Sequence, residues 1–127
     1  MRTAGTSPYE ALYGFSRALR VGNRILVSGT APVEEDGSST PGDAAAQARR
    51  CFAIILKAIE ELGGSAAEVV RTRMYIIDPT DADIVGSVHG ELFGETRPAA
   101  TMVVVKALLR DEWLVEIEAE ALVGGDA

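Results

Sequence analysis

The fold is decided by ten residues near the end of the chain, Trp113-Leu114-Val115-Glu116-Ile117-Glu118-Ala119-Glu120-Ala121-Leu122. Apolar and acidic side chains alternate along this run, and successive side chains of a β-strand point to opposite faces of the sheet. The run therefore predicts a strand with one apolar face, which packs on a core, and one face of carboxylates.

Two further runs belong to the same predicted sheet. The run 69–78 alternates in the same way and puts Arg73 on the charged face. The run 100–108 is apolar on both faces, and we expect Met102 and Val104 on the charged face as well. That face therefore mixes arginines, carboxylates and aliphatic side chains.

The remaining elements follow from turn and cap signals. Asp43 is a typical helix N-cap, and Gly63-Gly64 is a typical helix end, since glycine adopts the left-handed cap conformation easily. A Gly22-Asn23 pair between two strand-like runs indicates a hairpin. The predicted elements are strands at 13–20, 24–28, 69–78, 100–108 and 113–122, and helices at 43–62 and 80–93.

The predicted order is ββαβαββ, a single α+β sheet with both helices on one face. Right-handed crossovers put both helices on the same side of the sheet. A monomer seldom leaves a mixed apolar sheet face in water, so we expect this face to meet other copies of the chain in a closed assembly.

Length and charge limit the function classes. The 127 residues suit one domain, 1–127, and 12 Lys and Arg against 19 Asp and Glu give a formal charge of −7. This balance disfavours nucleic-acid binding, and Arg17, Arg20 and Arg24 are interpreted as the solvated edge of a hairpin. No run predicts a membrane span or a signal peptide, and Cys51 has no partner for a disulfide, so we expect a cytoplasmic protein.

Several motifs in order resemble the RidA/YjgF family. The stretch 22–32, Gly-Asn-Arg-Ile-Leu-Val-Ser-Gly-Thr-Ala-Pro, resembles its signature. Gly42-Asp43 with Gln47, the run 69–72, Asp78 and the run 114–119 match further along the chain.

The resemblance implies a bacterial chorismate-mutase-like fold, a homotrimer, and small-molecule sites in clefts between subunits. Members that are deaminases hydrolyse reactive 2-imino acids. Their site residues carry over to Ser28 and Gly29 of the signature and to Glu116, which would position water. Phe15 falls where the family usually has a tyrosine.

One position departs from the family pattern. The deaminases read Pro-Ala-Arg where this chain has Pro98-Ala99-Ala100, and an alanine cannot bind a substrate carboxylate through paired charged hydrogen bonds. Arg73 and Arg97 are the two candidates to replace that arginine. We further expect backbone groups near Gly29 and Met102 to bind polar atoms of the ligand.

Each candidate also has a purely structural interpretation. Glu116 belongs to an acidic strip that solvent or ion pairs satisfy, and Arg73 pairs with Glu116 or Glu118 across the subunit interface. Ser28 satisfies a turn at the end of its strand. His89 lies on the surface or packs a helix, because no second donor stands four residues away, and we expect neither a metal nor a cofactor. Cys51 is a small buried hydrophobe.

Three functions remain to be compared. The first is hydrolysis of a small reactive imine or enamine, by a mode other than the usual arginine-anchored one. The second is a non-catalytic small-molecule-binding trimer with a regulatory role. Ribonuclease activity, the third, is disfavoured by the acidic charge and the lack of a histidine pair.

Overall fold

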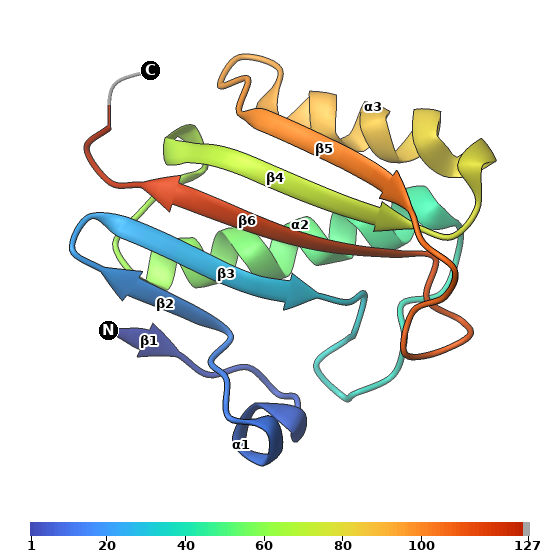
Figure 1. Cartoon of the computed structure of the whole chain (residues 1–127), viewed down its shortest axis with the longest axis horizontal. Helices are drawn as coiled ribbons and strands as arrows, with labels where there is room; N and C mark the ends of the chain where they lie inside the picture. The colour runs from blue at the N-terminus through green and yellow to red at the C-terminus, as the bar shows by residue number, and fades with distance from the viewer. Residues whose placement is uncertain (126–127) are drawn as a thin grey trace.

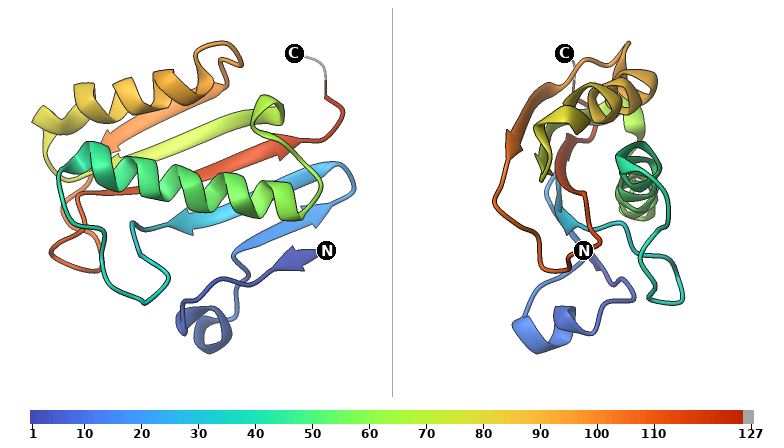
Figure 2. Two further views of the ribbon diagram at one scale, coloured as in Figure 1. Left: turned by 180° about the vertical axis from the view of Figure 1, so that it is seen from behind. Right: turned by 90° about the vertical axis from the view of Figure 1, so that its right-hand side faces the viewer.

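The computed structural model describes residues 1–125 and contains one sheet of six strands in the order β1-β2-β3-β6-β4-β5. Figure 1 shows the sheet in front of helix α2, and the edge-on view of Figure 2 shows α2 and α3 on the same side of it. The strands are β1 Arg2–Thr3, β2 Ala18–Val21, β3 Arg24–Thr30, β4 Val69–Ile76, β5 Ala99–Val104 and β6 Val115–Leu122. The helices are α1 Tyr9–Tyr13, α2 Ala44–Glu61 and α3 Ala82–Phe93, with 3₁₀ turns η1 Ala66–Glu68 and η2 Pro79–Asp81.

The predicted α+β architecture is confirmed from β2 onward. Strands β3, β6 and β4 pair antiparallel at the centre of the sheet, and α3 carries the chain from β4 to its parallel neighbour β5. The two helices cover one face, as expected. The 3₁₀ turn η2 precedes α3, so the predicted helix at 80–93 begins two residues later, at Ala82.

The N-terminal segment differs from its prediction. The expected strand at 13–20 is wrong in its first half, because residues Tyr9–Tyr13 form a short helix and β2 begins only at Ala18. Gly14 ends that helix with a φ of 79°, a conformation that glycine adopts without strain. Strand β1 was not predicted, since two residues carry no periodic signal.

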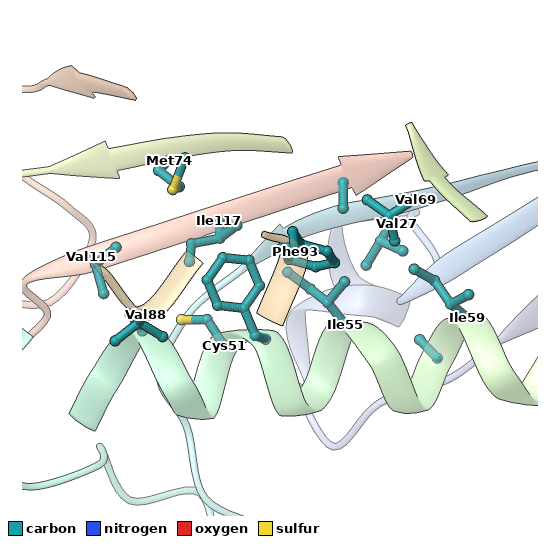
Figure 3. Close-up of a cluster of buried hydrophobic side chains, with 14 of the residues drawn as sticks. Val27, Cys51, Ile55, Ile59, Val69, Met74, Val88, Phe93, Val115 and Ile117 are labelled. Atoms are coloured by element: carbon teal, nitrogen blue, oxygen red, sulfur yellow. The ribbon is translucent and has the colours of Figure 1, made fainter. Parts of the chain in front are cut away.

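Helix α2 begins and ends at the predicted signals. The Asp43 carboxylate accepts a hydrogen bond from the Ala46 N–H at 3.0 Å, and Gly63 follows the helix with a φ of 89°. Its buried stripe packs on the inner face of the sheet (Figure 3). The core includes Val27, Cys51, Phe52, Ile55, Ile59, Val69, Met74, Val88, Phe93, Val115 and Ile117.

The predicted facing of the side chains holds in β6 and in most of β4 but is wrong in β5. Strand β6 buries Val115 and Ile117 and leaves the three glutamates on the other face. In β5, Met102 lies beside the buried Met74 and packs against the core, and Val104 lies beside Ile76. The expectation that Met102 and Val104 share the charged face was therefore wrong. Because both faces of this strand are apolar, its facing is set by its register against β4.

The face without helices, which we call the open face, is more polar than expected. Arg73 lies 3.6 Å from Glu118 and 3.7 Å from Glu120, and Arg24 lies 3.2 Å from Glu120. Tyr75 donates a hydrogen bond to Glu118. Four charges of this face, those of Arg24, Arg73, Glu118 and Glu120, therefore pair within one chain.

Within residues 1–125, no helix is both long and apolar enough to cross a lipid bilayer.

Candidate functional site

The candidate site lies where β3 departs from regular pairing with β6. The register shifts between Val27 and Thr30, which leaves Ser28 and Gly29 in a bulge. The Glu116 carboxylate, from the neighbouring strand, lies against Gly29 so closely that a Cβ on this glycine would come within 2.8 Å of its Oε2. Because Gly29 has no Cβ, the Glu116 carboxylate has room to lie against it.

Ser28 is held by several polar contacts, among them a 2.8 Å hydrogen bond that its carbonyl accepts from the Thr30 hydroxyl. Its N–H donates to the Arg17 carbonyl at 3.1 Å, and its Oγ donates to the Ser16 carbonyl at 2.7 Å. Its own carbonyl accepts from Arg17 Nη2 at 2.7 Å. The hydroxyl proton is therefore in use, whereas the lone pairs of the same oxygen can still accept a hydrogen bond.

A groove of about 580 Å³ adjoins this bulge, a size that suits a small molecule. Four residues that the sequence singled out, Phe15, Ser28, Gly29 and Glu116, all line it. Much of its wall comes from the N-terminal segment 3–10, from α2, from the loop 31–37 after β3, and from the loop that carries Leu109 and Trp113. The fold thus brings together segments that are far apart in the sequence.

The Glu116 carboxyl has a raised pKa, chiefly because burial disfavours its charged form. The nearby Arg17 guanidinium opposes this shift, and the negative charge of Glu118 adds to it. A carboxylate that holds its proton more tightly than usual is a better general base near neutral pH. Its surroundings therefore suit the removal of a proton from water.

A second hollow, of about 460 Å³, lies beside the groove on the open face. Phe15 and Ser28 line both hollows, so they stand between them. Leu19, Leu26, Glu118 and Glu120 also line the second hollow.

Arg73 and Arg97 do not reach the groove within one chain. Arg73 is on the face of Glu116, as expected, but its guanidinium pairs with the next two glutamates of β6. Arg97 is exposed and precedes β5 at the end of the strand remote from Glu116. The register puts it six residues before the Val103 level at which Glu116 lies, on the order of 15–20 Å along the strand.

Ala100 and Met102 are also apart from the groove within one chain. Ala100 lies beside the buried Thr72, and Met102 lies beside Met74, so both face the helices. The substitution of alanine for arginine at this position therefore changes a residue that neighbours neither Ser28 nor Glu116 in the same subunit.

Two groove residues were not identified from the sequence. Arg17 was interpreted as part of a solvated edge, but its side chain extends under the bulge and binds the Ser28 and Gly29 carbonyls, each at 2.7 Å. Glu10, on α1, is buried and accepts hydrogen bonds from the Gly5 N–H. The one available signal was the run Ser16-Arg17-Ala18, where a charged residue precedes a buried strand.

His89 and Cys51 have structural roles, as expected. His89 Nε2 is 2.8 Å from the Thr72 hydroxyl, and its ring packs on Phe52 and Phe93. Cys51 is fully buried, and burial raises the pKa of its thiol. Within the part of the chain that the structure describes, no three His, Cys, Asp or Glu side chains gather as metal ligands.

The fold and the groove together define a class: a small α+β protein with helices on one side of its sheet and a polar groove at a strand bulge. The chain belongs to the YjgF/RidA family, because the family model described as Endoribonuclease L-PSP matches residues 5–123.

Relatives in sequence and structure agree with this assignment. The Mycobacterium tuberculosis protein Rv2704, described as a member of the YjgF/YER057c/UK114 family, has a crystal structure that matches with a TM-score of 0.87 at 41% identity, covering 97% of this chain and 98% of that chain. A protein of Streptomyces coelicolor is 37% identical over 97% of this chain and 92% of its own length. The Escherichia coli 2-iminobutanoate/2-iminopropanoate deaminase is 31% identical over 95% of each chain.

Proposed function

We propose that this protein hydrolyses a small reactive imine or enamine in the groove beside the β3 bulge. The observation that carries the proposal is the position of Glu116, a partly buried carboxylate with a raised pKa, packed against Gly29 in a groove lined also by Phe15 and Ser28. The deaminase named among its relatives gives the substrate class.

The proposed reaction consumes one water and releases ammonia. Glu116 accepts a proton from water as the water oxygen forms a bond to the imine carbon, and the C=N electrons move to nitrogen. The nitrogen takes up two protons, both from the attacking water: the first is returned by Glu116, and the second leaves the added hydroxyl as its oxygen forms the C=O bond. The C–N bond then breaks, leaving a ketone and ammonia. Ser28 Oγ accepts a hydrogen bond from the nitrogen or the added hydroxyl.

We also propose that the protein acts as a homotrimer with the chorismate-mutase-like arrangement expected for the family. Its open face carries Val103 41% exposed beside the paired charges, and no helix of residues 1–125 covers it (Figure 2). Subunits that meet on this face would add residues of a neighbour to the hollows beside Phe15. Arg97 and Ala100, which are remote from Glu116 in one chain, would approach a groove only in this way. Sedimentation at low protein concentration measures the expected mass of three chains, and a stable monomer would contradict it.

A non-catalytic small-molecule-binding trimer is the second candidate. Two observations favour it: the Ser28 hydroxyl proton is already bound to the Ser16 carbonyl, and Ala100 lacks the guanidinium of the deaminases. RNA cleavage is not proposed, because a formal charge of −7 opposes binding of a polyanion.

Ammonia release from 2-iminobutanoate, formed in the assay by an amino-acid oxidase, tests the proposal. Glu116→Gln keeps the shape of the side chain but removes the base, and we expect it to lower kcat about 10²–10⁴-fold. Glu91→Gln is the matched control, since Glu91 pairs with Arg49 on the helix side of the molecule. Equal activity in the wild type and in Glu116→Gln would refute the catalytic role. Ligand binding without turnover would favour the second candidate.

A further inference from the structure

Arg17 is a partly buried cation without a carboxylate partner. Among residues 1–125, no Asp or Glu oxygen lies within 4.0 Å of its guanidinium nitrogens, although six such pairs occur elsewhere in this part of the chain. Its Nε is buried and has no hydrogen-bond partner within the described part of the chain. Removing a guanidinium from water without an anion to balance it is unfavourable.

The fold nevertheless fixes this guanidinium in place. Nη2 donates to the Ser28 carbonyl and to the Gly29 carbonyl, each at 2.7 Å, and the Arg17 N–H donates to the Thr3 carbonyl at 3.0 Å. These hydrogen-bond partners are neutral, so they orient the group without forming an ion pair with it. Arg17 also lines the groove that holds Glu116. Burial lowers the pKa of Arg17, and the charges of Glu10 and then Glu116 oppose this shift from beyond ion-pair distance.

Glu10 does not take the place of the missing anion. Both of its carboxylate oxygens accept the Gly5 N–H, at 2.9 and 3.0 Å. A Cβ on Gly5 would lie 2.6 Å from Glu10 Oε2 and 3.2 Å from Arg17 Cδ. Gly5 therefore sits between the carboxylate and the aliphatic stem of the arginine. Glu10 holds the N-terminal segment over the stem and forms no ion pair with the guanidinium.

The other cations of the groove are already satisfied or solvated. Arg50 lies 2.9 Å from the Glu34 carboxylate and also donates to the Val33 carbonyl. Arg110 is exposed and stacks over the Trp113 ring at 5.3 Å. The Lys57 side chain is 73% exposed. Among the described cations that line the groove, Arg17 alone is partly buried, held by hydrogen bonds and without an ion-pair partner.

We propose that Arg17 binds the carboxylate of the ligand, in place of the arginine that is absent at Ala100. The ligand class is a small 2-oxo or 2-imino acid, with its carboxylate at Arg17 and its C2 atom toward Glu116. This assignment rests on the proposed function for the location of the chemistry. It replaces Arg73 and Arg97 as candidates, because Arg73 pairs with Glu118 and Glu120 and Arg97 lies at the far end of β5.

Calorimetric binding of two unreactive probes tests the assignment without requiring turnover. The probes are 2-oxobutanoate and 2-oxobutanamide, which have the same shape and differ in charge. We expect the wild type to prefer the acid, and Arg17→Met to lose roughly ten- to a hundredfold in affinity for the acid with little change for the amide. Arg49→Met, which removes an arginine from the helix surface, is the matched control and should bind both probes as the wild type does.

Three results would overturn the assignment. The first is a wild type that binds neither probe or does not prefer the acid. The second is an Arg17→Met variant with unchanged affinity for the acid. The third is an equal loss for both probes, which would indicate a structural role. Should Arg17→Met fail to fold, Arg17→Lys keeps the charge but not the planar donors, and its selectivity for the acid should fall; unchanged selectivity would refute the proposal. Acid-selective binding without ammonia release would leave Arg17 assigned and refute the hydrolase proposal alone.

Discussion

Replacing Gly29 by alanine should impair catalysis while leaving the fold intact. Gly29 does not have a positive φ, so alanine is compatible with its backbone conformation. The added Cβ would come 2.8 Å from Glu116 Oε2 and 3.6 Å from the carboxyl carbon, with no other atom of the described chain within 4 Å apart from its own chain neighbours. The strain therefore falls on one carboxylate.

The size of the effect follows from this contact. Ordinary van der Waals separation requires the carboxylate oxygen to withdraw by roughly half an ångström or more. The end of a glutamate side chain can do so at little energetic expense, so the free energy of unfolding should change by no more than about 1 kcal/mol. A misplacement of about 1 Å in an active site can lower activity about a hundredfold. We therefore expect kcat/KM for 2-iminobutanoate to fall roughly ten- to a hundredfold.

The assay combines ammonia release with urea unfolding monitored by circular dichroism. Gly90→Ala serves as the control, because Gly90 lies within α3 and a Cβ at this position would meet open space. Alanine there should raise the free energy of unfolding by up to about 1 kcal/mol and leave activity unchanged. Full activity in a properly folded Gly29→Ala protein would show that the position of Glu116 against the bulge does not matter for the reaction.

The remaining predictions concern stability. A raised pKa means that the folded state holds the Glu116 proton more tightly than the unfolded chain, so ionisation destabilises the protein as pH rises from about 4.5 through the folded pKa. Arg17 and Glu118 face this group, and the effect of desolvation on its pKa outweighs the opposing effect of the Arg17 charge. Glu116→Gln should therefore be more stable than the wild type at pH 7 and equal to it below pH 4. Urea titrations at both pH values measure this difference. Asp43→Ala removes the α2 cap and should lower the free energy of unfolding by about 0.5–2 kcal/mol, and an unchanged urea midpoint would contradict the capping role. Gln47→Leu leaves the Leu114 N–H without its 2.8 Å acceptor and should lower the free energy of unfolding by about 1–3 kcal/mol. Phe52→Ala empties a fully buried site, for which a melting experiment should reveal a loss of about 3–5 kcal/mol.

Much of the site could be predicted because its residues belong to short motifs. Ser28, Gly29 and Glu116, which the family signature and the last strand singled out, line one groove within a chain, and Phe15 lines it from the segment before β2. What could not be predicted was the arginine beside them. Arg17 precedes a buried strand in the sequence, and its side-chain direction depends on the β3 bulge and on the N-terminal segment that folds over it.

Local sequence by itself determined the elements whose signals are periodic or chemical: the alternation of β6, the cap of α2 at Asp43, and the glycine that ends that helix. Tertiary structure alone decided which way the side chains of β5 face. Both faces of this strand are apolar, so the side of Met102 is set by its pairing with Met74. Tertiary structure also decided that Arg73 pairs with Glu118 and Glu120, and that Arg17 lies next to Glu116. The physical reason is that periodicity is a property of consecutive residues, whereas the partner of a charge is fixed by strands that meet from distant parts of the chain.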